Sequence, residues 1–133
     1  MSSGEVRIAI RGEPDVTRAI LESGRACTAI GCRDDQKSRV TTAVSELARN
    51  ILKYADSGEI VVRARETRHA RGVQVTAVDR GPGIEDVERA LADHYSSGGT
   101  LGLGLPGVRR LMDEFDVQST CGEGTRVTAT LWL

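Results

Sequence analysis

The first third of the chain shows one strand pattern followed by a helical pattern. Residues 5–11 (EVRIAIR) alternate polar and apolar side chains, as a half-buried strand does. A Gly-Glu-Pro break follows, and Asp15 can cap a helix that runs to about Ile30. Gly31 is expected to stop this helix, because glycine readily adopts the left-handed conformation at helix ends.

A second, longer helix is predicted from Asp34 or Asp35 to about Ala55. The two acids suit the positive end of the helix dipole. Apolar residues recur at helical spacing and predict one core-facing stripe, formed by Val40, Ala43, Val44, Leu47, Ile51 and Tyr54.

The rest of the chain alternates strands with short helices. Two strands are predicted at residues 60–66 and 73–78, after a turn at 56–58, and a short helix at about 85–94.

A glycine-rich stretch then leads into a helix from about Leu105 to Phe115. Its expected core residues are Leu105, Val108, Leu111, Met112 and Phe115. Residues 117–120 and 126–133 predict a closing pair of strands around the turn 122–124. This order predicts a single α+β domain over residues 1–133, a two-layer sandwich with helices on one face of a mixed or antiparallel sheet.

Composition and charge exclude several classes of protein. The 133 residues suit one domain, and 39% hydrophobic with 28% charged residues is typical of a soluble globular chain. The net charge of −1 gives no case for nucleic acid or an anionic membrane as partner. No apolar run approaches the ~20 residues of a membrane span. The basic run at residues 63–71 is expected to be a solvated hairpin, with a docking patch for an acidic protein as the alternative.

The cysteines indicate reduced thiols rather than disulfides or a metal site. Cys27, Cys32 and Cys121 are odd in number and lack C-x-x-C spacing, and His69 and His94 stand alone. Together with the absence of a signal-like segment at Met1, this predicts a cytoplasmic protein.

The glycine-rich stretch YSSGGTLGLGLPG raises a choice between nucleotide loops. Gly102, Gly104 and Gly107 match the G-x-G-x-x-G spacing of a dinucleotide loop, but no core strand precedes them. A Walker A loop is excluded because the chain has no Gly-Lys-Ser/Thr. A flexible loop is the plain alternative. Gly102 and Gly104 precede a helix, however, where free N–H groups and the dipole favour a phosphate.

Three further motifs carry candidate chemistry. In SELARN, Glu46 and Asn50 are four residues apart and share a helix face. Asn50 offers a carbonyl oxygen to Mg²⁺, and Glu46 could accept a proton from a hydroxyl; the alternative is an exposed polar pair on the flank of a helix. Asp79 ends a strand before Arg-Gly-Pro-Gly; this sequence is either a simple turn or a fixed carboxylate for the exocyclic amine of adenine. Thr125, in the turn GEGT, could support that carboxylate.

In this order, SELARN, DRGPGI, GLGLPG and GEGT resemble the N box, two glycine boxes and closing motif of the GHKL superfamily of gyrase, heat-shock chaperone, histidine kinase and mismatch-repair ATPases. The resemblance covers about residues 34–133. It implies a Bergerat-type ATP site with Asn50 on Mg²⁺ and Asp79 on adenine. Gly81 and Gly83 would lie beside the adenine ring.

The resemblance also assigns the glycine-rich stretch. Residues 96–100 would form a short ATP lid, in which Gly98, Gly99 and Thr100 contact the nucleotide. Gly102 and Gly104 would lie at the phosphates, and Thr125 would back Asp79.

Within this superfamily, NILKYA, DHYSSGG and GLGLPGVRRLMDEF resemble the small anti-sigma-factor-type serine/threonine kinases of partner switching, and the stressosome switch kinases (RsbT-like) most of all. This implies an ATP- and Mg²⁺-dependent kinase acting on STAS-domain proteins, with Glu46 as base, and afterwards binding a downstream phosphatase or sigma-pathway regulator. The alternatives are an anti-sigma or phosphatase-activating module that holds ATP but has little or no kinase activity, and a nucleotide-free scaffold. The role of Lys53 and the oligomeric state stay open.

Overall fold

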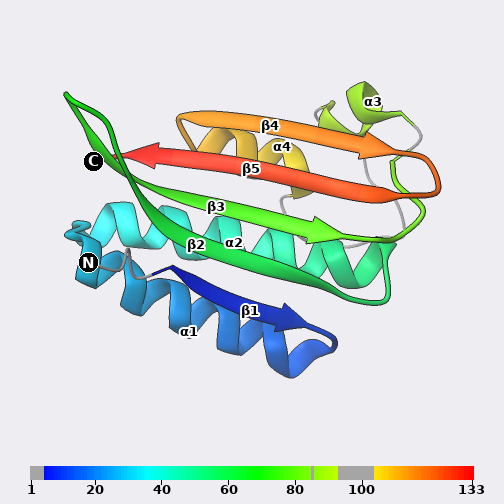
Figure 1. Cartoon of the computed structure of the whole chain (residues 1–133), viewed down its shortest axis with the longest axis horizontal. Coiled ribbons are helices and arrows are strands. Elements are labelled where there is room, and N and C mark those ends of the chain that lie inside the picture. Colours follow the sequence, from blue (N-terminus) through cyan, green and yellow to red (C-terminus); the bar gives the residue numbers. More distant parts are fainter. Residues whose placement is uncertain (1–4, 85, 93–103) are drawn as a thin grey trace.

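The protein folds as two layers, an antiparallel sheet and helices packed on one of its faces (Figure 1). The computed structural model describes residues 5–84, 86–92 and 104–133. Its elements are, in chain order, β1 (Val6–Ile10), α1 (Glu13–Ile30), α2 (Asp34–Tyr54), β2 (Gly58–Glu66), β3 (Arg71–Asp79), α3 (Val87–Leu91), α4 (Gly104–Leu111), β4 (Glu114–Thr120) and β5 (Gly124–Trp132).

The sheet has five strands in the order β1-β2-β3-β5-β4. Each neighbouring pair in the described part of the chain is antiparallel, so the antiparallel form of the prediction is confirmed and the mixed form is wrong. The reason is topological. The β2–β3 and β4–β5 connections are hairpins, and β5 inserts between β3 and β4 rather than crossing over to lie parallel to a neighbour.

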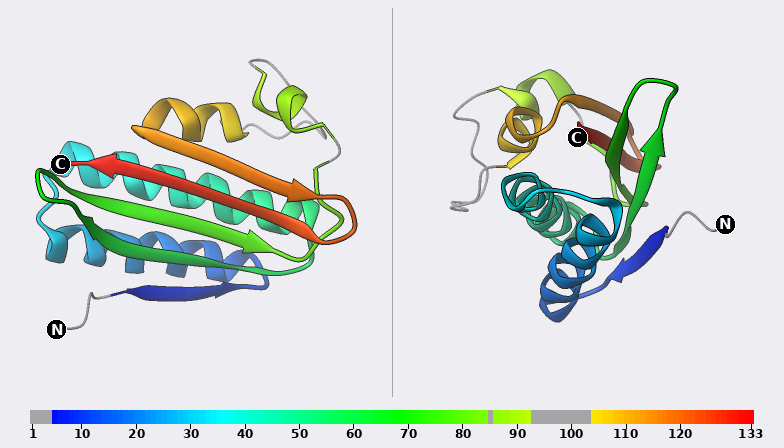
Figure 2. Two further views of the ribbon diagram at one scale, coloured as in Figure 1. Left: turned by 45° about the horizontal axis from the view of Figure 1, so that its top comes forward. Right: turned by 90° about the vertical axis from the view of Figure 1, so that its left-hand side faces the viewer.

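The core lies between the sheet and α1, α2 and α4, as Figure 2 shows from the side. Alternate strand residues face it, for example Ile60 and Val62 of β2 and Val73 and Val75 of β3, all fully buried. Burying such a side chain stabilises the fold by about 1.5–3 kcal/mol. The predicted stripe of α2 is buried from Val40 to Ile51, but Tyr54 is 37% exposed. Tyr54 was therefore wrongly assigned to the core; it is the last residue of α2, beyond the sheet-covered part of the helix.

The first helix begins two residues earlier than its predicted cap. Gly12 is the N-cap residue and α1 starts at Glu13, while Asp15 lies in the first turn. The Asp15 carboxylate still satisfies the helix start, because its Oδ2 accepts hydrogen bonds from the N–H groups of Arg11 (2.8 Å) and Gly12 (3.2 Å). The Arg11 bond is the main reason that the pKa of Asp15 is lowered.

The end of the last helix was predicted too far along the chain. α4 ends at Leu111, and Phe115 belongs to β4, which starts three residues before the predicted strand. The N–H of Asp113 donates a hydrogen bond to the carbonyl of Thr130 (2.8 Å), so the chain is already paired with β5 just before β4 begins. An apolar residue such as Phe115 fits helical and strand patterns equally well, and here the pairing with β5 decides.

Candidate nucleotide site

The predicted motifs that the structure describes meet at one end of the sandwich. Asp79 is the last residue of β3, and Thr125 pairs with it from β5. Gly81 lies against the end of α2, where Ala55 and the carbonyl of Tyr54 would be 2.7 and 2.8 Å from an added Cβ. Glu46 on α2 contacts the start of α4 through Gly104. Four segments far apart in sequence therefore converge here.

The Glu46 carboxylate lies at the N-terminus of α4. Its Oε1 accepts a hydrogen bond of 3.0 Å from the N–H of Gly104, and its side chain is only 11% exposed. Arg49 lies 3.9 Å from Oε2, one turn along α2. A free N–H at a helix start favours an anion, and here the chain supplies its own. The sequence predicted both residues for the site but gave no sign of this contact.

Asn50 lies one turn beyond Glu46 on α2 and is half-buried. Its amide oxygen is a suitable ligand for Mg²⁺, which takes few protein ligands when phosphates and water supply the rest. Among the described residues, no group of three or more His, Cys, Asp or Glu could hold a metal ion. The single amide donor of Asn50 is compatible with a Mg²⁺ ion that is bound mainly by phosphates and water.

Asp79 is held in position by the loop that follows it. Its Oδ1 accepts a hydrogen bond of 2.9 Å from the N–H of Gly81, the geometry of an Asx turn. The strand alternation places Asp79 on the same side of β3 as the buried Val75 and Ala77, toward the helices. One neighbour was missed from the sequence. Gly58 pairs with Asp79 from β2, and a Cβ there would lie 3.2 Å from the Asp79 Cβ and 2.8 Å from a methyl of Ile51.

The glycines of DRGPG have a packing reason of their own. Gly81 lets its loop approach the end of α2, as described above. Gly83 has a φ of +83°, and a Cβ there would lie 2.6 Å from the carbonyl oxygen of Thr120. Both glycines thus fix the loop between α2 and the β4–β5 hairpin. Their predicted place beside an adenine ring stays a prediction.

Thr125 is buried, and its hydroxyl contacts Ser119 of β4 at 2.9 Å. Ser119 Oγ also accepts a 2.6 Å hydrogen bond from the N–H of Ile84. Ser119 therefore ties the loop after Asp79 to the closing strands. It was missed in the sequence because an isolated Ser in an alternating strand carries no signal.

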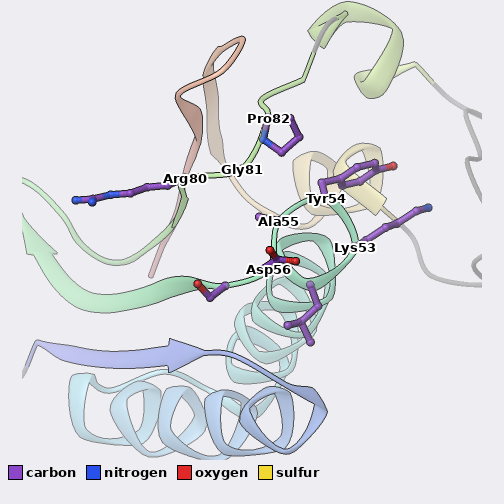
Figure 3. A pocket seen from close by; sticks show the side chains of 9 residues that line it. Lys53, Tyr54, Ala55, Asp56, Arg80, Gly81 and Pro82 are labelled. Carbon is purple, nitrogen blue, oxygen red and sulfur yellow. The ribbon is translucent and has the colours of Figure 1, made fainter.

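A cavity of about 410 Å³ opens beside this loop (Figure 3). It is lined by Leu52, Lys53, Tyr54, Ala55, Asp56, Ser57, Arg80, Gly81 and Pro82. The Lys53 ammonium lies 5.3 Å from the centre of the Tyr54 ring. The remaining predicted contacts, Gly98, Gly99, Thr100 and Gly102, lie outside the described residues.

The fold and the site define a class of protein. Residues 10–131 match the model of the histidine kinase-like ATPase domain, and the chain belongs to this family. The GHKL resemblance drawn from the sequence is thereby confirmed.

Individual relatives point to a particular branch. The chain is 42% identical over 126 residues to the serine/threonine-protein kinase RsbT of Bacillus subtilis (strain 168), covering 95% of each chain. It is 32% identical over 98 residues to an anti-sigma F factor of Caldanaerobacter subterraneus subsp. tengcongensis, covering 71% of this chain and 68% of that protein. The predicted resemblance to RsbT-like kinases is confirmed.

Solved structures agree on the fold. The RsbU and RsbW domains of a Mycobacterium tuberculosis protein match with a TM-score of 0.66 at 19% identity, over 96% of this chain and 32% of that longer one. A mycobacterial sensor histidine kinase, MprB, matches with a TM-score of 0.57 at 20% identity, over 96% of this chain and 95% of that one. Within the described residues, no helix is long and apolar enough to cross a membrane.

Proposed function

We propose that this protein is an ATP-dependent serine/threonine kinase of the partner-switching type, which phosphorylates a STAS-domain protein. The 42% identity to RsbT over nearly the whole chain supports the reaction class. The observation that carries the proposal is the Glu46 carboxylate, which is nearly buried and held at the start of α4.

The described residues have distinct roles in binding. The N–H of Gly81 fixes the Asp79 carboxylate through Oδ1, and the second carboxylate oxygen accepts a hydrogen bond from the exocyclic amine of adenine. The start of α4 attracts the phosphates through its helix dipole, since the N–H of Gly104 itself is bound to Glu46. Further nucleotide contacts are proposed for Gly98, Gly99, Thr100 and Gly102. Asn50 is the protein ligand of Mg²⁺, which offsets the phosphate charge when bound.

Glu46 then acts on the partner's hydroxyl group. The N–H of Gly104 orients the carboxylate through Oε1, which leaves Oε2 to accept the proton of a Ser or Thr hydroxyl. As the proton leaves, the hydroxyl oxygen bonds to the γ-phosphorus, the bond to the β–γ bridging oxygen breaks, and ADP is released. Because phosphoryl transfer depends mostly on positioning and charge, a domain of this size suffices.

A second candidate is a binding module that holds ATP and a sigma-pathway protein without transferring phosphate. The 32% identity to an anti-sigma F factor supports it. The two functions differ in their need for Glu46, since nucleotide binding alone needs Asn50 and Asp79 but no base. On the kinase proposal, the unphosphorylated partner competes with a downstream phosphatase or sigma-pathway regulator for the protein.

The test is phosphate transfer by the purified full chain to a STAS-domain protein encoded near it, with labelled ATP and Mg²⁺. Glu46→Gln keeps an oxygen that can accept from Gly104 but removes the base. We expect transfer to fall by about 10²–10⁴-fold while ATP affinity stays within a factor of about two. Glu22→Gln on the outer part of α1 makes the same chemical change away from the site and should be neutral.

Each outcome separates the candidates. ATP binding by the parent protein without any transfer would favour the binding module and defeat the kinase proposal. Equal transfer by the parent and Glu46→Gln would leave a kinase but refute the base. Asn50→Ala should weaken binding of ATP more in the presence of Mg²⁺ than in its absence, which tests the metal ligand separately.

A further inference from the structure

The helices cover one face of the sheet, and the described residues leave the other face open (Figure 2). A shallow groove of about 860 Å³ runs over this open face, lined from β1, β2, β3 and β5. The register places Val78 and Thr76 of β3 at its floor, between Glu59 and Val61 of β2 and the facing residues of β5. The middle of the groove is therefore formed by small side chains.

Arginines dominate the charge of the groove. Five line it, Arg7, Arg11, Arg63, Arg80 and Arg126, together with three acids. Two of the acids, Glu5 and Glu59, are engaged by one arginine, Arg7, at 3.5 and 3.1 Å. The third, Asp79, ends β3 with its side chain on the helix-facing side of the sheet, where the N–H of Gly81 donates to its carboxylate.

Four of these arginines have no carboxylate within 4.0 Å among the described residues: Arg11, Arg63, Arg80 and Arg126. Arg63 donates instead to the neutral side chain of Gln74 (2.9 Å). A chain with a net charge of −1 therefore concentrates unneutralised positive charge on one concave face. A guanidinium group can donate two parallel hydrogen bonds to one carboxylate, which makes arginine the usual residue for binding carboxylates at protein interfaces.

We propose that this open face is a docking surface for an acidic protein segment. Arg63 of β2 lies opposite Gln74 of β3, and Arg126 of β5 lies opposite Val78 of β3. The two arginines therefore lie on either side of β3, at positions four residues apart along that strand. Two strand spacings and four residues of rise separate their Cα atoms by roughly 16 Å. A segment with carboxylates about 16 Å apart, three turns of a helix, reaches both.

Protein fits this surface better than nucleic acid. Glu5 and Glu59 lie in the same groove and would repel a phosphate backbone, whereas a protein segment can place uncharged or basic side chains against them. Among the residues that line the groove there is no aromatic side chain on which a base could stack.

The groove also borders the cavity beside the loop that follows Asp79. Arg80 lines both cavities, and it directly follows Asp79 in the chain. Figure 3 shows its side chain extending away from Pro82 and Tyr54. A docked acidic segment would thus contact the loop that carries Asp79, while the face with Glu46 and Gly104 stays free for another partner.

The test uses the full chain and a fluorescein-labelled helical peptide with glutamates along one side. Its control is the same peptide with glutamine in place of glutamate. Arg63→Glu/Arg126→Glu reverses two groove charges, and Arg25→Glu/Arg68→Glu makes the same change in net charge at exposed arginines outside the groove. We expect the groove variant to bind the acidic peptide at least about tenfold more weakly and the control variant within about twofold of the parent. Backbone NMR shifts on peptide addition should map to the outward residues of β1, β2, β3 and β5.

The remaining outcomes would overturn the proposal. Equal loss of binding in both variants would mean general charge attraction, and shifts mapped elsewhere, or no binding at all, would remove the surface. Tighter binding of a single-stranded oligonucleotide at the same residues would assign the groove to nucleic acid. Self-association that is lost in the groove variant alone would assign it to a second copy. Thermal unfolding and ATP binding of each variant, expected to match those of the parent, confirm that the fold and the nucleotide site are intact.

Discussion

Gly124, the first residue of β5, permits the closest backbone contact around Asp79. A Cβ at this position would overlap the carbonyl oxygen of Asp79 and lie 2.8 Å from the Cα of Arg80. These are backbone atoms, which cannot rotate away as the end of a side chain can. We therefore expect Gly124→Ala to force β5 and the end of β3 apart.

Gly122, two residues earlier, isolates this effect. Both glycines have positive φ, +82° at Gly122 and +127° at Gly124, but an added Cβ at Gly122 would meet nothing within 4 Å. Backbone strain alone should cost Gly122→Ala about 1–2 kcal/mol. Gly124→Ala carries similar backbone strain together with overpacking of about 1–3 kcal/mol, so its total should reach about 2–5 kcal/mol.

Urea unfolding followed by circular dichroism measures both costs, and calorimetry should show a decrease in Tm of about 4 °C per kcal/mol for a chain of this size. Because the displaced backbone carries Asp79, Gly124→Ala should also weaken ATP binding, and Gly122→Ala should not. The reasoning is refuted if the two variants unfold within about 0.5 kcal/mol of each other, a difference comparable to the error of such measurements.

Two further predictions concern thiol reactivity and acid stability. Cys27 is buried, and burial raises the pKa of its thiol to about 12. Iodoacetamide should therefore label the exposed Cys121 in the native protein and reach Cys27 only on unfolding. Mass analysis of the peptides measures the labelling, and labelling of Cys27 in the native protein would contradict its burial. The pKa of Glu114 is lowered by hydrogen bonds that it accepts from Trp132 Nε1 (2.7 Å) and Arg65 Nη1 (2.9 Å). Glu114→Gln should therefore be less stable than the parent above about pH 5, and the difference should shrink as the pH falls through the folded pKa; a Tm difference that is constant from neutral pH to about pH 3 would show that the charge contributes nothing.

The sequence by itself determined which elements form and which residues are candidates for the chemistry. Strand alternation and helical spacing act over neighbouring residues, so β1, α1, α2 and the β2–β3 hairpin were predicted to within about two residues at most ends. The four motifs and their order identified the family, because the contacts to a nucleotide require particular side chains at fixed spacing.

Only the tertiary structure decided what those residues touch. The boundary between α4 and β4 depends on β5, the strand that follows β4 in the chain. The backbone of Asp113 and Glu114 pairs with Thr130 of β5, and this pairing ends the helix. Gly81 was predicted for its closeness to a ligand, yet in the fold its missing Cβ makes room for the end of α2. The hydrogen bond from Gly104 to Glu46 joins residues 58 positions apart, and no local pattern encodes it. Periodicity fixes which side of an element is buried, but the partner across the interface is set by how the elements pack together.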